Sequence, residues 1–85
     1  MEFEWDEAKG AKVKAERGVS FEEIAAALNE HGALSILEHP NNPNQKLFIV
    51  QIGMEVWVVV IEPRSAKLRI VTAYPNRKLR KKYGI

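Results

Sequence analysis

The chain has 85 residues and no cysteine, which allows one small core but excludes disulfides and thiolate zinc sites. Its apolar fraction of 46% is ordinary for a soluble globular protein. No apolar run is long enough to span a membrane, and the acidic start of the sequence differs from a signal peptide. The two histidines, His31 and His39, lack the spacing of metal ligands. We therefore expect a single domain over residues 1–85 that is cytoplasmic, needs no cofactor and holds no metal.

Charge is distributed unevenly along the chain, although the formal net charge is only +2. Residues 1–62 contain five basic and eleven acidic residues, which leaves −6, whereas residues 63–85 contain eight basic and no acidic residues, which leaves +8. A basic segment of this density is typical of proteins that bind an anionic partner, most simply a nucleic-acid backbone. It is equally compatible with a solvated tail that keeps the protein soluble.

The first residues predict a short strand followed by a helix. Apolar Phe3 and Trp5 alternate with acidic residues, as in a strand with one apolar face. Asp6 is a suitable N-cap for a first helix over residues 7–16. Its weak apolar face, which we expect to pack on a sheet, consists mainly of small residues: Ala8, Ala11 and Ala15.

The second helix has the clearest local pattern in the sequence. Ser20 and Glu23 form a capping box at its start. A core-facing stripe with helical spacing follows: Phe21, Ile24, Ala25 and Leu28. We expect the helix to end near His31, with Gly32 as the terminating residue.

The apolar pattern changes from a helical period to a strand period after Gly32. Four strands are expected, separated by turns that contain proline, asparagine or glycine, over residues 33–37, 46–52, 55–61 and 67–74. The strand over residues 55–61 is apolar on both faces, so it should lie in the middle of the sheet. In the last strand, strict alternation sets one group of side chains on one face: Leu68, Ile70, Thr72 and Tyr74.

The end of the chain predicts a short basic helix. We expect Pro75 to end the last strand because it has no N–H to donate. Asn76 can cap the helix that follows. Leu79 and Tyr83, four residues apart, should anchor this helix to the body of the protein. The predicted fold class is α+β: two N-terminal helices packed on a mostly antiparallel sheet of four to five strands, with a short basic C-terminal helix. The helices should cover one face and leave the other face, with Arg69, for a ligand.

Several motifs follow one another in the order found in a known protein family. They are Phe3-Glu4-Trp5-Asp6-Glu7-Ala8-Lys9, Gly18-Val19-Ser20-Phe21-Glu22-Glu23, Ala33-Leu34-Ser35-Ile36, Phe48-Ile49-Val50-Gln51-Ile52-Gly53, Leu68-Arg69-Ile70-Val71-Thr72-Ala73 and Arg77-Lys78-Leu79-Arg80-Lys81-Lys82-Tyr83. With them the chain resembles, over nearly its whole length, the BrnT family of bacterial type II toxins, small ribonucleases with a RelE-like fold. The resemblance implies a toxin that cleaves RNA and inhibits translation, and a cognate antitoxin that restrains it. The antitoxin would carry the DNA-binding part, so operator DNA would be contacted only indirectly.

Three positions depart from the family pattern. Family members often have histidine where this chain has Arg17, and they usually have arginine where it has Tyr74 and glutamate where it has Leu79. The segment Thr72-Ala73-Tyr74-Pro75 instead resembles the end of other toxin nucleases in the wider barnase, EndoU and RelE-like group. The chain is identified as a divergent BrnT-like toxin.

Metal-independent cleavage of RNA needs a group that removes the proton of the 2′-hydroxyl, groups that stabilise the negative transition state, and a proton for the leaving oxygen. Arginine suits the second task because its planar guanidinium can hold two phosphate oxygens. The candidate catalytic residues are Arg69, Tyr74, Arg77 and Arg80, and the candidate substrate-binding residues are Thr72, Lys78 and Lys81.

Some of these assignments have alternatives. Arg69 could pair with an acid on a neighbouring strand, such as Glu55 or Glu62. His39, on its loop, could take the place of Tyr74 as acid or base. In a regular strand Tyr74 points away from Arg69, so both can reach one substrate only if the strand bends or twists.

The basic end also has interpretations in other functional classes. It could belong to a non-catalytic RNA- or DNA-binding module, or to a degenerate toxin that survives as an antitoxin-interaction protein. Cleavage of RNA by the purified protein distinguishes the enzyme from both.

Overall fold

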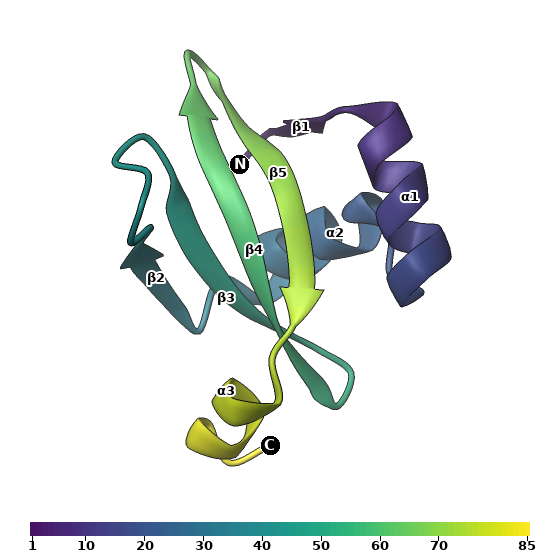
Figure 1. Cartoon of the computed structure of the whole chain (residues 1–85), viewed down its shortest axis with the longest axis vertical. Coiled ribbons are helices and arrows are strands. Elements are labelled where there is room, and N and C mark those ends of the chain that lie inside the picture. Colours follow the sequence, from purple (N-terminus) through teal and green to yellow (C-terminus); the bar gives the residue numbers. More distant parts are fainter.

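The computed structural model describes residues 1–85 and arranges three helices around a five-stranded mixed sheet (Figure 1). The elements follow one another as β1 (Phe3–Trp5), α1 (Glu7–Arg17), α2 (Phe21–His31), β2 (Ser35–Glu38), β3 (Lys46–Ile52), β4 (Glu55–Arg64), β5 (Lys67–Pro75) and α3 (Arg77–Lys82). The α+β class and the order of elements predicted from the sequence are confirmed. No helix among them combines the length and the apolar character needed to cross a membrane.

β4 is the central strand of the sheet, in which the strands lie in the order β1-β5-β4-β3-β2. Its residues from Val56 to Ile61 are all buried, as predicted for a strand that is apolar on both faces. The pairs β2–β3, β3–β4 and β4–β5 are antiparallel, and only the edge strand β1 runs parallel to its neighbour β5. A parallel pair is possible there because most of the chain connects the two strands.

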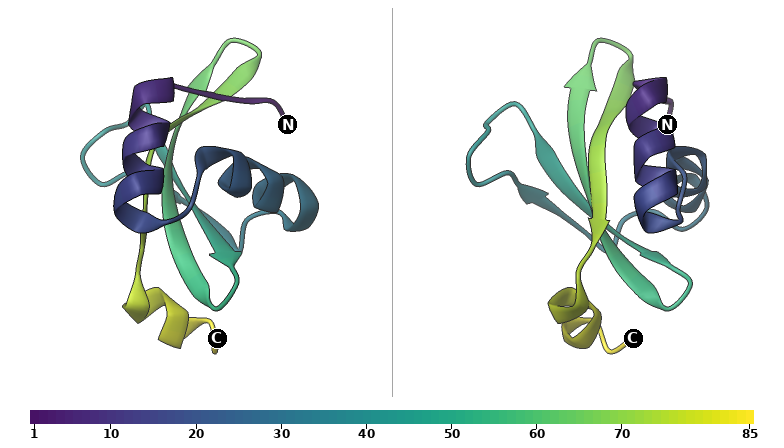
Figure 2. Two further views of the ribbon diagram at one scale, coloured as in Figure 1. Left: turned by 90° about the vertical axis from the view of Figure 1, so that its right-hand side faces the viewer. Right: turned by 45° about the vertical axis from the view of Figure 1, so that its right-hand side comes forward.

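α1 and α2 cover one face of the sheet, as the two views of Figure 2 show. α2 contributes Phe21, Ile24 and Leu28 to the main core, with the spacing predicted from the sequence. The rest of this core comes from α1, β3, β4 and β5: Val13, Phe48, Val50, Trp57, Val59, Ile61, Ile70 and Ala73. This face of the sheet is therefore filled by the protein itself.

α1 turns a different side to the core from the one predicted. The three alanines that were expected to face the sheet are exposed: Ala8, Ala11 and Ala15. Gly10 and Val13 are buried instead. A Cβ atom at Gly10 would lie 3.4 Å from the side chains of Trp5 and Phe21, whose rings pack edge to face with centroids 6.2 Å apart. The prediction is wrong because Gly10 and Val13 face these rings and the core, which leaves the three alanines on the exposed side of α1.

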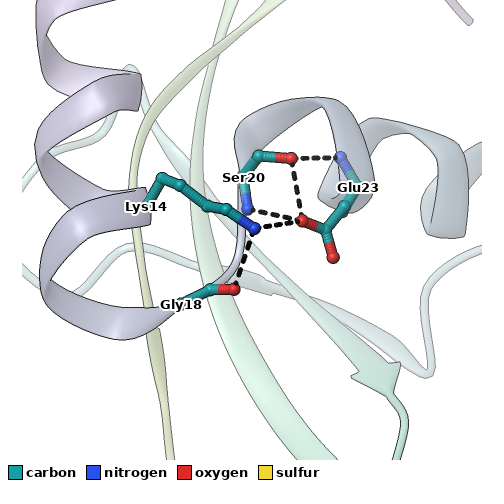
Figure 3. A network of polar contacts seen from close by, with 4 residues as sticks. All are labelled: Lys14, Gly18, Ser20 and Glu23. Atoms are coloured by element: carbon teal, nitrogen blue, oxygen red, sulfur yellow. Dashed lines mark hydrogen bonds and ion pairs between the residues drawn. The ribbon is translucent and has the colours of Figure 1, made fainter.

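The junction between α1 and α2 is held by a network of polar contacts (Figure 3). The Ser20 hydroxyl accepts a hydrogen bond from the Glu23 N–H (3.0 Å), and Glu23 Oε1 accepts one from the Ser20 N–H (3.2 Å), which confirms the capping box. Lys14 reaches over from α1 and donates to Glu23 Oε1 (3.0 Å) and to the Gly18 carbonyl (3.2 Å). The turn between the helices is thus fixed by residues that are close together in the sequence.

α3 packs against the other face of the sheet, beyond the end of β5 (Figure 1). Leu79, Tyr83 and Ile85 contact a second apolar cluster in β3 and β4, which consists of Ile49, Val56 and Val58. The Tyr83 hydroxyl is also hydrogen-bonded to Ser35 of β2. Leu79 and Tyr83 therefore anchor the helix, as predicted, and the rest of this face has no helix over it.

Candidate active site beside the C-terminal helix

A bulge in β5 changes the direction of its side chains. The register of β5 against β4 shifts between Val60 and Ile61, so that Val71 has no partner in β4. Ile70 and Ala73 are three positions apart, yet both lie in the core under α1 and α2. The extra residue therefore reverses the alternation in the second half of the strand.

The bulge brings Arg69, Thr72 and Tyr74 to the same face of the sheet. Tyr74 pairs with Val58, which belongs to the cluster under α3, and Arg69 pairs with Glu62, four residues further along β4. Directly paired residues share a face, so these side chains lie on the face that α1 and α2 leave free. The prediction that Thr72 and Tyr74 accompany Ile70 is wrong because it assumed an unbroken strand. In a regular strand Tyr74 would point away from Arg69. The bulge changes the direction of the side chains, so both residues lie on one face.

Arg69 is held by an ion pair with Glu4. Its Nη1 donates to Glu4 Oε2 at 3.0 Å, and the two residues are direct partners on β5 and β1. The alternative in which Arg69 pairs with an acid on a neighbouring strand is therefore confirmed, although the partner is Glu4 rather than Glu55 or Glu62. Glu62 is bound instead to Arg64, whose Nε lies 2.7 Å from Glu62 Oε2.

The candidate residues of α3 lie around a cleft between this helix and the start of β4, which we call the α3 cleft. Its volume is about 440 Å³, and it is lined by Glu55, Val56, Pro75, Asn76, Arg77, Arg80, Lys81 and Ile85. The Asn76 N–H donates to the Val56 carbonyl (2.8 Å). The Asn76 side-chain oxygen accepts from the Leu79 N–H (3.1 Å), which confirms Asn76 as the N-cap. These bonds hold the start of α3 against β4.

Three basic side chains dominate the charge of the α3 cleft. Arg80 Nε donates to the main-chain oxygen of Ile85 (3.1 Å), and none of Arg77, Arg80 and Lys81 forms an ion pair with a side-chain carboxylate. Guanidinium and ammonium groups that are not neutralised by the protein can bind a phosphate. The volume also lies within the range of ordinary ligand sites, roughly 300–1,000 Å³. The cleft therefore combines the volume of a small-ligand site with a positive lining.

Arg69 lies away from the α3 cleft. Six residue steps separate it from Pro75 along β5, which corresponds to about 20 Å at roughly 3.3 Å per residue. Arg69 lines a different groove, together with Lys9 and Lys12 of α1. One phosphate therefore cannot be held by Arg69 and Arg80 together.

The remaining predicted residues lie outside the lining of the α3 cleft. Thr72 and Tyr74 occupy the part of β5 between Arg69 and α3, and Tyr74 is 37% exposed. Lys78 is exposed on α3. His39 Nδ1 accepts hydrogen bonds from the backbone N–H groups that follow it, at 3.0 and 3.1 Å, so its side chain stabilises its own loop.

Two residues near the site were not among the predicted candidates. Glu55 lines the α3 cleft, and Arg17 Nη1 donates to the Ala73 carbonyl at 3.0 Å, directly before Tyr74. The position of Glu55 depends on the antiparallel register of β4 and β5, which no short motif reveals. Arg17 was marked in the sequence only by its departure from the family pattern.

The comparison with known families covers nearly the whole chain. The profile of a family described as "Ribonuclease toxin, BrnT, of type II toxin-antitoxin system" matches residues 5–82, from the end of β1 through α3. No curated protein matches the chain. Since the family profile includes both N-terminal helices, all of β4 and β5, and the α3 cleft apart from its last residue, the chain belongs to the BrnT family, the ribonuclease toxins of type II toxin–antitoxin systems.

Proposed function

We propose that this chain is a metal-independent endoribonuclease that inhibits translation, with its active site in the α3 cleft. Its membership of a family of ribonuclease toxins supports RNA as the substrate. The observation that carries the choice of site is the convergence of Arg77, Arg80 and Lys81 on one cleft of about 440 Å³. Cations gathered in this way suit a phosphate of the RNA backbone.

In the proposed reaction the 2′-hydroxyl of the RNA attacks the adjacent phosphorus and displaces the 5′-oxygen of the next nucleotide. Negative charge then increases on the non-bridging phosphate oxygens. Arg77 and Arg80 would each donate to these oxygens, and Lys81 would add a further positive charge. No step of this reaction requires a metal, because protein side chains supply the charge stabilisation.

The exposed face of β5 would extend the site along the RNA. The Thr72 hydroxyl can donate to a phosphate, and the Tyr74 hydroxyl can position the substrate or give a proton to the leaving oxygen. Lys78 on α3 and Arg69, about 20 Å along the strand at roughly 3.3 Å per residue, would contact nucleotides that flank the cleavage point. The RNA would therefore lie along the face that α1 and α2 leave free.

The same cations are proposed to bind the antitoxin that a type II family implies. Residues 63–85 contain eight basic and no acidic residues, so an acidic segment of the antitoxin would be attracted to them. Such a segment would cover the α3 cleft and exclude RNA. Operator DNA would then be contacted only through the antitoxin, in the cytoplasm.

The test is cleavage of RNA by the purified protein, separated from any antitoxin, in the presence of EDTA. Products with a 2′,3′-cyclic phosphate are expected, and an RNA with 2′-deoxyribose at the cleavage point should resist. Arg80→Ala should reduce the rate about 10²-fold or more, the usual effect of losing one charge-stabilising donor. Arg64→Ala is the control, because Arg64 is bound to Glu62 and does not line the α3 cleft. RNA binding without cleavage, both alone and with translating ribosomes, would support a non-catalytic binding module instead.

A further inference from the structure

Glu55 is the only acidic residue that lines the α3 cleft, where the other charged residues are Arg77, Arg80 and Lys81. We infer that Glu55 is the general base of the cleavage reaction and removes the proton of the 2′-hydroxyl. The inference rests on the ribonuclease function proposed above. It fills the one role that the cations cannot take, since guanidinium and ammonium groups have no acceptor for a proton.

The backbone holds Glu55 beside the first residue of α3. The Asn76 N–H donates to the Val56 carbonyl at 2.8 Å, which continues the antiparallel pairing of β4 and β5 beyond Pro75. Glu55 precedes Val56 and Arg77 follows Asn76, and both residues line the α3 cleft. An acidic residue and a basic residue of the cleft therefore lie on neighbouring backbone segments.

The carboxylate of Glu55 has no fixed partner in the protein. Four other carboxylates form ion pairs with lysine or arginine, those of Glu4, Glu23, Glu38 and Glu62. Glu55 is exposed at the first position of β4 and takes part in none of these pairs, although three cations line the same cleft. An RNA phosphate held by those cations would bring its 2′-hydroxyl toward a carboxylate that is free to accept a proton.

The proton balance of the reaction is complete with Glu55 and water. The 2′-hydroxyl proton passes to the Glu55 carboxylate as the bond between O2′ and phosphorus forms. The bond between phosphorus and O5′ breaks, and the leaving O5′ takes a proton from water, either directly or through the Tyr74 hydroxyl, which water then reprotonates. The products are a 2′,3′-cyclic phosphate and a free 5′-hydroxyl, and Glu55 returns its proton to the solvent.

Other candidates for the base are less well placed. His39 Nδ1 already accepts two backbone N–H groups, and its loop contributes no residue to the α3 cleft. Tyr74 does not line the cleft either. Its phenolic O–H group is suited to donating a proton rather than to removing one.

The experiment compares Glu55→Gln with the wild-type protein in two assays. The first measures single-turnover cleavage of an RNA oligonucleotide. The second measures binding of the same oligonucleotide with 2′-deoxyribose at the cleavage point, which prevents cleavage. The cleavage rate should fall roughly 10²–10⁴-fold, as is typical when a general base is lost. The Kd of the uncleavable oligonucleotide should stay the same or decrease, because the change removes a negative charge near phosphate.

Two further variants keep the test specific. Glu55→Asp retains a carboxylate and should recover part of the lost rate, whereas Glu16→Gln, at an exposed acid of α1 outside the cleft, should cleave at the wild-type rate. If Arg80→Ala abolishes cleavage while Glu55→Gln cleaves at the wild-type rate, the assignment of Glu55 is wrong and the proposed ribonuclease site stands. If the wild-type protein does not cleave RNA, the proposed function fails and the role of Glu55 fails with it.

Discussion

Arg69 and Glu4 join the last strand to the first one across the parallel pair of β5 and β1, with 3.0 Å between Arg69 Nη1 and Glu4 Oε2. Their side chains are 30% and 33% exposed, so the pair is partly shielded from solvent. The guanidinium is thereby held at the opposite end of β5 from the α3 cleft. Arg69 thus contributes to the attachment of β1 and lies away from the proposed site in the α3 cleft.

Arg69→Ala should therefore affect cleavage far less than Arg80→Ala. We expect less than a tenfold loss of rate for Arg69→Ala and about 10²-fold or more for Arg80→Ala. Loss of the ion pair should lower the free energy of unfolding by about 1 kcal/mol or less, as for other partly exposed pairs. Cleavage assays and denaturant titrations of both variants check this. Equal losses of rate would contradict the separation of Arg69 from the α3 cleft.

Ser20→Ala should destabilise the protein by about 1 kcal/mol, because it removes the capping acceptor at the start of α2. The hydroxyl accepts the Glu23 N–H at 3.0 Å in the network of Figure 3. Glu22→Ala changes the same turn of the helix without touching the capping box and is the matched control. The two melting temperatures are to be compared, and an equal decrease in both would show that the capping box contributes nothing specific.

The stability of the protein should decrease in acid partly through Glu23. Hydrogen bonds from Lys14 and then from the backbone and side chain of Ser20 lower the pKa of Glu23 below its ordinary value of 4.5. A carboxyl whose pKa is lower in the folded state stabilises the fold above pH 4.5, and this contribution is lost as the pH falls through the folded-state pKa. Glu23→Gln should therefore be less stable than the wild-type protein at pH 7, and the difference should shrink in acid. Thermal melts across this range measure it, and a difference independent of pH would contradict the assignment.

Val58→Asp should prevent folding. Val58 is 4% exposed and lies in the cluster under α3, so the substitution would bury a charge without a partner. Ile36→Asp is the control, since Ile36 is 59% exposed on the edge strand β2. Far-UV circular dichroism and thermal melts distinguish the two outcomes. A cooperative melt of Val58→Asp at the wild-type temperature would be inconsistent with a buried position in the central strand.

Reversal of the charges at Arg77 and Arg80 to glutamate should weaken the complex with the antitoxin. The proposed contact is electrostatic, so the wild-type affinity should fall steeply with added salt and that of the double variant should depend on salt much less. Lys9→Glu with Lys12→Glu is the control, because these residues line the separate groove beside α1. Calorimetric titrations at several salt concentrations give the comparison. An affinity that is unchanged by the substitutions and by salt would exclude α3 as the docking surface.

Features that depend on neighbouring residues could be predicted from the sequence. Asp6 caps α1, Ser20 and Glu23 form the capping box of α2, and Asn76 caps α3, as their local patterns indicated. The same holds for the central position of β4, because a strand that is apolar on both faces is favoured where neighbouring strands flank it and other side chains cover both faces. In each case the physical cause lies within one turn of helix or one strand.

The composition of the candidate site was decided by the tertiary structure. The bulge at Val71 sets Thr72 and Tyr74 on the face of Arg69, and it depends on the pairing of β5 with β4 rather than on any turn motif. Pairing between β1 and β5, at opposite ends of the chain, selects Glu4 as the partner of Arg69. The pairing of β4 with β5 likewise brings Glu55 to the α3 cleft, close to the start of α3. Strand register results from the packing of the whole sheet, so residues distant in the sequence become neighbours in ways that local patterns do not encode.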